Sequence, residues 1–325
     1  MMTKLLLKIL LFALLGYLLL LGLQHIIDSG LRKSRHEKFT EWNDIYQSRI
    51  NADLLIMGSS RAVVHISPKI LDSALKLNSY NIGMDGWSFM MQDGRFKIYL
   101  QHNRKPKYII QNVDVFLLTK PKQLYNYQQF LPYLNDTLIR QYTKGYEGEF
   151  TNYHYYLPLY KFNGCIEIAG EGLLSFIGIN RHKPVRYKGF EPMRKEWDGT
   201  FDEYKKLYPN GRPMPVDTSN KHEFISFLEY CKKENIKVIL VFTPELIEGH
   251  KYTTNRDEVV KMYQEFADKY QIPFLNYSND SLSYRKELFY NSQHLNDKGA
   301  ILFSKKLASD LNNIIYSSKQ LSKLY

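Results

Sequence analysis

The stretch Asp53-Leu-Leu-Ile-Met-Gly-Ser-Ser-Arg61 decides the fold that we predict for this chain. Its continuous apolar run is typical of a short strand that is buried on both faces of a parallel sheet. Gly58 allows a tight turn where the strand ends, and Ser67-Pro68 then marks the start of a helix, with serine as the N-cap. The two serines therefore lie at the carboxyl end of a strand, which is the edge where open α/β sheets bind ligands.

Strands and helices are predicted to alternate over most of the remaining chain, which favours a parallel sheet with right-handed crossovers. Residues 120–215 interrupt this alternation and are too long for a simple loop, so we predict an inserted subdomain or lid with helical pieces there. The further predicted strands are residues 79–86 (a short strand and turn), 108–118, 236–244 and 272–276, and the predicted helices are 68–77, 87–102, 219–233, 255–270 and 300–311.

One histidine near the end of the chain, His294, lies in a polar loop just before the predicted helix at 300–311. A histidine in a loop beside the sheet edge can serve as a general base, whereas the plainer interpretation is a solvated or capping side chain. The serines allow the same two interpretations, because a serine after a turn is usually only a turn residue. Neither feature taken alone decides between a structural and a catalytic role.

Three separate segments together resemble the SGNH (GDSL-type) hydrolases. Gly58-Ser-Ser60 is similar to their first motif, Asn81-Ile-Gly-Met-Asp-Gly86 to their second, and Asn291-Ser-Gln-His294 to their final Asp-x-x-His. The resemblance covers about residues 53–118 and 236–312. It implies an α/β, flavodoxin-like three-layer sandwich with strand order 2-1-3-4-5, in which the loops after strands one, two and five meet at one edge.

The resemblance also implies a role for each residue of the final motif and of the first. Ser60, and not Ser59, would be the nucleophile, His294 would take its proton, and Asn291 would orient the histidine ring. No metal or cofactor is implied.

Two positions depart from the family pattern. This chain has Gln111-Asn-Val-Asp114 in place of Gly-x-Asn-Asp, and it has Asn291 in place of an aspartate. The oxyanion hole would then use the backbone N–H groups of Ser60 and Gly83 together with Asn112. An amide oxygen can hold the histidine but cannot stabilise an imidazolium by charge. A catalytically impaired scaffold that binds a glycan or a membrane partner is therefore the alternative to an enzyme.

The N-terminal residues 5–23 are almost entirely apolar, which is close to the roughly 20 residues that a membrane span needs. No small-x-small cleavage signature follows Leu23, so residues 1–24 favour an uncleaved signal anchor over a cleaved signal peptide. Lys4 and Lys8 precede this segment, but four basic residues soon follow it, so the positive-inside rule does not favour an exterior domain. We nevertheless place the domain outside, because the membrane-anchored proteins that it resembles work on envelope substrates.

The remaining boundaries follow from the anchor. Residues 25–50 are charged with few apolar positions and are interpreted as a stalk, and residues 51–325 as the SGNH-like domain, with the insertion at about 120–215. The insertion is rich in tyrosine, of which the chain has 26, and tyrosine rings suit sugars and interfaces alike.

The net charge of +11 suits an anionic membrane surface, an acidic polymer or nucleic acid, but no nucleic-acid-binding motif is present. We therefore expect no nucleic acid partner. A nucleic-acid binder would instead show strongly salt-dependent binding to DNA or RNA. The expected function is O-acyl transfer to, or deacylation of, an envelope polysaccharide or other carbohydrate. The resemblance to proteins of polysaccharide acetylation and teichoic acid D-alanylation also implies a membrane-bound acyl-donor protein as partner.

Overall fold

The computed structural model describes residues 2–183 and 185–321, and the chain divides into two compact units. Unit 1 consists of Met1–Gln47 and Lys122–Val185, and unit 2 consists of Ser48–Pro121 and Arg186–Tyr325. The segment that we predicted to be a stalk thus belongs largely to unit 1. The predicted insertion is divided between the two units.

The centre of unit 2 is a five-stranded parallel sheet in the order β2-β1-β3-β4-β5, which confirms the predicted fold class and strand order. The first four residues of the opening stretch are fully buried strand residues, as their apolar character predicts. The strands are β1 (Leu54–Met57), β2 (Ser79–Asn81), β3 (Tyr108–Val113), β4 (Lys237–Phe242) and β5 (Phe274–Asn276).

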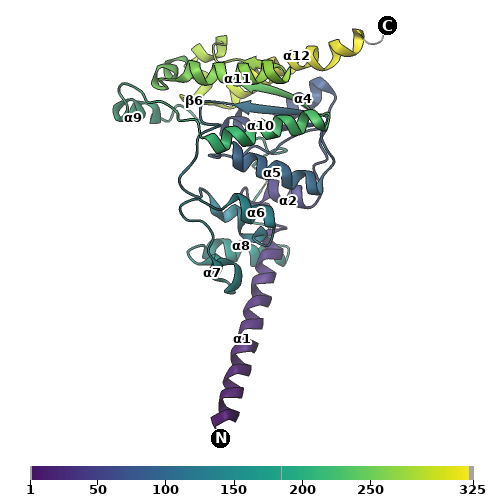
Figure 1. Ribbon diagram of the computed structural model, residues 1–325, viewed down its shortest axis with the longest axis vertical. Helices are drawn as coiled ribbons and strands as arrows, with labels where there is room; N and C mark the ends of the chain where they lie inside the picture. The colour runs from purple at the N-terminus through teal and green to yellow at the C-terminus, as the bar shows by residue number, and fades with distance from the viewer. Residues whose placement is uncertain (1, 184, 322–325) are drawn as a thin grey trace. The chain divides into compact units, whose positions relative to one another are not determined.

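Helices cover both faces of this sheet, as Figure 1 shows for α4 and α12 on one side and α5 and α10 on the other. The first face carries α3 (Ser60–His65), α4 (Pro68–Leu75) and α12 (Asp297–Leu321). The second carries α5 (Phe89–His102), α10 (Thr218–Lys233) and α11 (Arg256–Tyr270), which meet through the ring of Phe224. Unit 2 also contains α9 (Thr200–Leu207), the hairpin β6 (Phe289–Asn291) with β7 (His294–Leu295), and the 3₁₀ turns η3 (Ile247–Tyr252), η4 (Ser281–Tyr284) and η5 (Lys286–Leu288).

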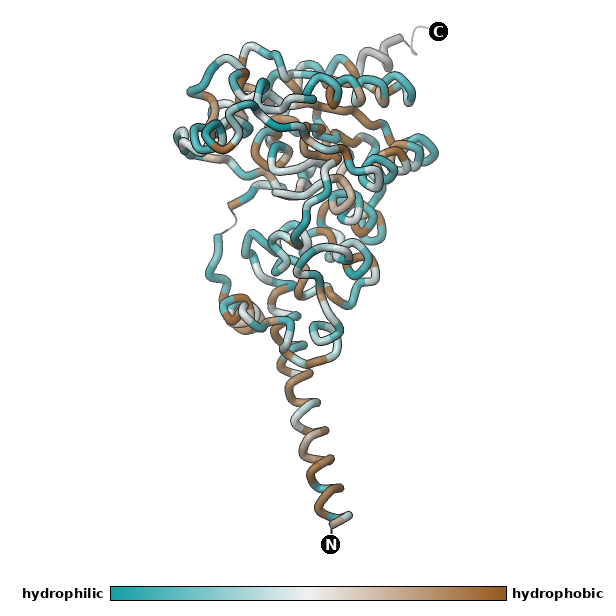
Figure 2. Tube along the Cα trace, turned by 60° about the vertical axis from the view of Figure 1, so that its left-hand side comes forward, coloured by the Kyte–Doolittle hydropathy of each residue, from teal (hydrophilic) through white to brown (hydrophobic). Residues whose placement is uncertain are grey.

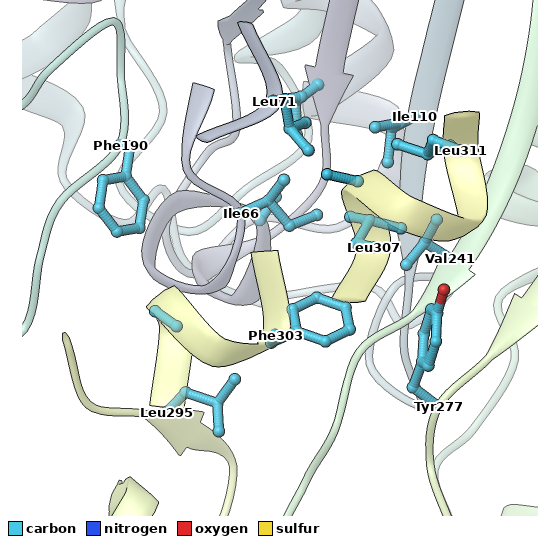
Figure 3. Packing of buried hydrophobic residues seen from close by; sticks show 14 of the residues in the cluster. Ile66, Leu71, Ile110, Phe190, Val241, Tyr277, Leu295, Phe303, Leu307 and Leu311 are labelled. Atoms are coloured by element: carbon cyan, nitrogen blue, oxygen red, sulfur yellow. The ribbon is translucent and has the colours of Figure 1, made fainter. Parts of the chain in front are cut away.

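The last helix is held to the sheet by an apolar core. Phe303, Leu307 and Leu311 of α12 are fully buried and belong to the same cluster as Ile110 and Val241 of the sheet, as Figure 3 shows. Burial of side chains of this size stabilises a fold by about 1.5–3 kcal/mol each. This packing fixes the hairpin that immediately precedes α12.

Unit 1 begins with α1 (Met2–Leu31), a helix that is long and apolar enough to cross a membrane. Its most apolar 18-residue window has a mean hydropathy of 2.5, and none of that window is buried; Figure 2 shows the corresponding brown segment. Only the last turns, around Ile27 and Leu31, are buried in unit 1. Within the described residues, no other helix passes this test of length and composition.

The end of α1 packs closely against α8 (Ile166–Phe176). A Cβ atom at Gly30 would lie 1.7 Å from the carbonyl oxygen of Gly172, so only glycine permits this approach of the two backbones. The other helical elements of unit 1 are α2 (Thr40–Tyr46), η1 (Tyr127–Tyr133), α6 (Thr137–Tyr142), α7 (Asn152–Tyr156) and η2 (Tyr160–Phe162).

Candidate active site

Ser60 and His294, which are 234 residues apart in the sequence, lie within hydrogen-bonding distance of each other. The Ser60 Oγ atom is 2.7 Å from His294 Nε2. Ser60 opens α3 directly after β1, and His294 opens β7 directly before α12. Between β1 and α3, Gly58 has φ of +149°, and a Cβ atom there would lie 2.7 Å from the Cβ atoms of Ala62 and Asn112. The glycine therefore lets the serine stand at the carboxyl edge of the sheet.

Asn291 fixes the tautomer of the histidine. Its Oδ1 atom accepts hydrogen bonds from the backbone N–H groups of Gln293 and His294, both at 3.0 Å, which sets the orientation of the amide. The same oxygen is 2.9 Å from His294 Nδ1, so Nδ1 carries the ring proton. Nε2 is then an acceptor, and it faces the Ser60 hydroxyl as a general base must.

A buried positive charge lies close to this histidine. Burial lowers the pKa of His294 to about 3, and the positive charge of Arg61 acts in the same direction, while Asp198 opposes both. The Arg61 guanidinium is itself buried and lies 2.8 Å from Glu245, which also pairs with Arg256 at 2.8 Å. His294 is therefore neutral, and able to accept a proton, well below its ordinary pKa of about 6.5.

Asn291 connects the histidine to an aspartate that sequence analysis did not identify. The Asn291 Nδ2 atom donates to Asp198 Oδ2 at 3.4 Å, and the other Asp198 oxygen accepts from the backbone N–H and the hydroxyl of Thr200. Burial alone would raise the pKa of Asp198, but the hydrogen bonds from Thr200 and Asn291 outweigh it and lower this pKa. The order of contacts is thus serine, histidine, asparagine and charged carboxylate.

A second histidine, His65, supports the strand that carries the first. Its Nε2 atom accepts the backbone N–H of Leu295 at 2.9 Å, so its Nδ1 proton is directed to Thr243 Oγ1, also at 2.9 Å. Burial lowers the pKa of His65 well below 6.5, and the positive charges of Arg61 and of a protonated His294 act in the same direction. His65 thus holds β7 in place only while it is neutral.

We therefore expect the stability of unit 2 to fall as the pH drops below about 6.5. The unfolded chain takes up a proton at His65 that the folded chain does not, so His65 contributes a slope of up to about 1.4 kcal/mol per pH unit. Chemical denaturation in detergent between pH 4.5 and 7.5 should show a shallower slope for His65→Gln, whose amide oxygen can still accept from Leu295. An unchanged slope in that variant would assign the acid sensitivity to other groups.

The groups proposed for the oxyanion hole have different surroundings. The Gly83 N–H donates to Asn81 Oδ1 at 2.9 Å, and Asn81 in turn donates to the carbonyl of Ala62. The Asn112 amide is fully buried, and its nitrogen donates to the carbonyls of Val241 at 3.0 Å and Val113 at 3.4 Å. The amide hydrogens of Asn112 are therefore directed into the sheet in this structure.

The backbone N–H of Ser60 differs from these two groups. It is the first residue of α3, where a backbone N–H has no partner within the helix. By contrast, the Ser59 hydroxyl donates to Asp114 Oδ2 at 2.6 Å and is buried. Of the two serines, Ser60 is thus the one whose hydroxyl faces a histidine.

One cavity of unit 2 lies elsewhere, around Tyr108, Cys231 and Lys237, where β3 and β4 begin. It is at the opposite edge of the sheet from Ser60. A smaller cavity lies beside Arg61 and is lined by Phe201, Tyr204, Ser292 and Gln293, among others. Its lining thus includes Arg61 and Gln293, the sequence neighbours of Ser60 and His294.

Fold and site together define a parallel α/β protein with a serine–histidine pair at the carboxyl edge of its sheet. Neither protein-family models nor curated proteins match this chain. Similar solved structures include a protein from Bacteroides fragilis described as a proposed acylhydrolase (13% identity, TM-score 0.36). The matched region covers 80% of this chain and 86% of that protein's chain.

Two further structures are similar at the same level. One is a protein from Streptococcus pneumoniae described as a proposed platelet activating factor, with 14% identity and a TM-score of 0.38. The matched region covers 93% of this chain and 98% of that protein's chain. The other is a possible lipase from Chitinophaga pinensis, with 12% identity, a TM-score of 0.36 and coverage of 81% and 98%. TM-scores this low support no argument about activity.

Proposed function

We propose that this chain is a membrane-anchored SGNH-like esterase or O-acyltransferase that acts on a cell-envelope polysaccharide through a serine acyl-enzyme. The observation that carries the proposal is the 2.7 Å contact between Ser60 Oγ and His294 Nε2, with the opposite ring nitrogen held by Asn291. The transferred group in this proposal is an acyl group, most simply acetyl.

The proposed reaction has two halves. Ser60 Oγ attacks the carbonyl carbon of the acyl donor while His294 Nε2 takes the hydroxyl proton, and the backbone N–H of Ser60 stabilises the oxyanion. His294 then returns the proton to the leaving oxygen. In the second half, His294 activates a sugar hydroxyl or water, which takes the acyl group and restores the serine. Transfer and hydrolysis differ only in this acceptor.

The substrate class is supported by two features of the chain. The α1 helix would keep the protein at the membrane, and the many tyrosines offer flat rings for sugars. The proposed location is the exterior (periplasmic or extracytoplasmic) side of the membrane, with a membrane-bound acyl-donor protein as a partner. Protease treatment of intact cells tests the side, because an exterior unit 2 should be digested without lysis.

A chromogenic acyl ester tests the proposed chemistry. We expect purified full-length protein in detergent to release nitrophenol from 4-nitrophenyl acetate with an initial burst of one equivalent, followed by slower turnover. Adding a de-O-acetylated envelope polysaccharide should speed turnover if the enzyme is a transferase. His294→Ala should remove both phases. Absence of any burst with a range of acyl donors would contradict the proposal.

The second candidate function is a non-catalytic SGNH-like scaffold that binds a glycan. It is favoured by the surroundings of the oxyanion donors, because the Gly83 N–H and the Asn112 amide already have partners. This candidate predicts glycan binding without nitrophenol release. Equilibrium binding of envelope polysaccharide, measured beside the ester assay, therefore separates the two candidates.

The anchor yields its own prediction. Residues 5–23 should remain in the mature protein, because their exposed apolar side chains need a bilayer and no cleavage signature follows them. N-terminal sequencing of protein extracted from membranes checks this. A mature chain that starts after Leu23 would show a cleaved signal peptide and remove the anchor from the proposal.

A further inference from the structure

Unit 1 exposes a group of apolar side chains beside α1, which we call the interfacial patch. It consists of Tyr153 and Tyr156 of α7, the following Leu157, and Ile166 at the start of α8, with exposed fractions of 64, 65, 48 and 82%. A soluble surface rarely gathers such residues without a partner. Figure 1 shows α7 and α8 beside the part of α1 remote from the N-terminus.

Two hydrogen bonds fix the height of α7 along α1. The Tyr17 hydroxyl donates to the carbonyl of Tyr156 at 3.0 Å, and the backbone N–H of Leu159 donates to Gln24 Oε1 at 2.7 Å. On the helix, Gln24 is about 10 Å beyond Tyr17. The chain from Tyr156 to Leu159 therefore follows α1 from the level of Tyr17 to that of Gln24.

The α8 helix meets α1 at the buried end of α1. A Cβ atom at Gly172 would lie 2.6 Å from the carbonyl oxygen of Ile27, and one at Gly30 would lie 2.9 Å from the backbone nitrogen of Phe176. The Lys33 Nζ atom lies 5.2 Å from the centre of the Phe176 ring, so the last residue of α8 lies beside the polar residues that follow α1. Ile166 is at the other end of α8.

These levels lie within the segment that a bilayer would cover. The stretch from Leu5 to Leu23 is about 28 Å long as a helix, close to the thickness of a hydrocarbon core of about 30 Å. Tyr17 lies about 9 Å inside its end, and helices at a membrane surface are immersed by about 5–10 Å. The Tyr156 carbonyl would then lie about 9 Å below the boundary of acyl chains and headgroups, which is within that range.

The chemistry of the segment suits that depth. Residues 150–160 contain no lysine, arginine, aspartate or glutamate, and five of these eleven residues are aromatic apart from His154: Phe150, Tyr153, Tyr155, Tyr156 and Tyr160. Tyrosine is enriched where membranes meet water. A backbone oxygen in lipid needs a donor, and Tyr17 supplies one to Tyr156.

We propose that the interfacial patch lies in the outer part of the acyl region, just below the headgroups, of the same bilayer that α1 spans, so that unit 1 is partly immersed in the lipid surface instead of standing clear of it. This inference rests on the proposed function, in which α1 is a membrane anchor. The ligand is a lipid surface, with Leu157 and Ile166 in contact with acyl chains and the tyrosine hydroxyls at headgroup level. The contact would limit how far α1 can tilt.

Spin labels at three single positions of the full chain test the proposal. Leu157→Cys reports on the interfacial patch, Leu14→Cys on the middle of α1, and Ile177→Cys serves as the matched control. Ile177 is also an exposed apolar residue, at 68%, but it follows Phe176, whose ring lies 5.2 Å from Lys33 Nζ, beyond the apolar segment. The two native cysteines are buried, and the labelled parent chain measures their background.

The labelled proteins are reconstituted in phosphatidylethanolamine–phosphatidylglycerol vesicles, and collisions with oxygen and with a water-soluble nickel chelate are measured. We expect the Leu14 and Leu157 labels to be several-fold less accessible to nickel and more accessible to oxygen than the Ile177 label. A Leu157 label as open to nickel as Ile177, with Leu14 in lipid, would overturn the patch and keep the anchor. A Leu14 label in water would overturn both.

A Leu157 label that is shielded from nickel and oxygen alike would also overturn the proposal, because a protein surface and not lipid would then cover the patch. The signal of a second copy is separable from that of a different protein. Dipolar broadening between Leu157 labels on neighbouring chains would indicate a second copy.

Discussion

Replacing Ser60 by alanine should remove acyl-enzyme formation altogether, with a loss in turnover on the order of 10⁶-fold, as serine–histidine pairs show when the nucleophile is deleted. The reason is geometric, because the Ser60 hydroxyl is the one that lies 2.7 Å from His294 Nε2. A fluorophosphonate probe followed by peptide mass spectrometry measures the labelled serine directly. We expect the label on Ser60 and none in Ser60→Ala.

The neighbouring serine provides the matched control. Ser59 Oγ donates to Asp114 at 2.6 Å inside the protein, so Ser59→Ala leaves a buried carboxylate oxygen without that donor and should cost about 1–3 kcal/mol of stability. Labelling of the folded Ser59→Ala protein should nevertheless persist at Ser60. A label found on Ser59, or one that survives Ser60→Ala, would show that the nucleophile is assigned to the wrong residue.

The position of this serine could be predicted because its determinants are local. A buried apolar strand, a glycine and a serine N-cap specify strand, turn and helix within a few residues, and parallel topology then places the serine at the carboxyl edge. The ends of elements were less predictable. The predicted strand at 108–118 ends at Val113, because Asp114 Oδ1 accepts the backbone N–H of Phe116 and turns the chain.

Long-range side-chain contacts could not be predicted in this way. Asp198 lies 93 residues from Asn291 in an irregular segment with no periodic pattern, so nothing in the sequence connects the two. Arg61 was visible only as the residue after the serine, and its buried pairing with Glu245 depends on the loop after β4. The partners of Gly83 and Asn112 likewise depend on how close the neighbouring backbones pack.

Exchanging the amide and the carboxylate behind the histidine should move the pH profile of the reaction. In the native site Asn291 lies between Asp198 and His294, and Asp198 is exposed, so water screens the effect of its charge on the histidine. The double variant Asn291→Asp with Asp198→Asn would place the carboxylate against Nδ1 and keep an amide behind it. We expect the apparent pKa of the acidic limb of kcat/KM to rise by about one pH unit or more, because a neighbouring carboxylate raises the pKa of histidine.

The single variants calibrate that result. Asn291→Asp alone would bring two carboxylates to the positions now joined by the 3.4 Å contact, so we expect a smaller benefit than in the double variant. Asp198→Asn alone should slightly lower the apparent pKa of the acidic limb of kcat/KM. Rates near pH 7.5 should change far less than the roughly 10⁴-fold loss that follows when aspartate-to-asparagine replacement reverses a tautomer, because Asn291 already holds the useful one.

The direction of the shift separates support by charge from support by hydrogen bonding alone. The pKa of His294 is lowered to about 3 in the native site, so activity should persist to acidic pH until stability fails. If all four proteins share one acidic limb, Asn291 and Asp198 do not govern the histidine. If all four proteins are inactive while each still binds glycan, the protein is a scaffold and not an enzyme. A catalyst that lacked only a charge beside His294 would have become active in the variants that place a carboxylate there.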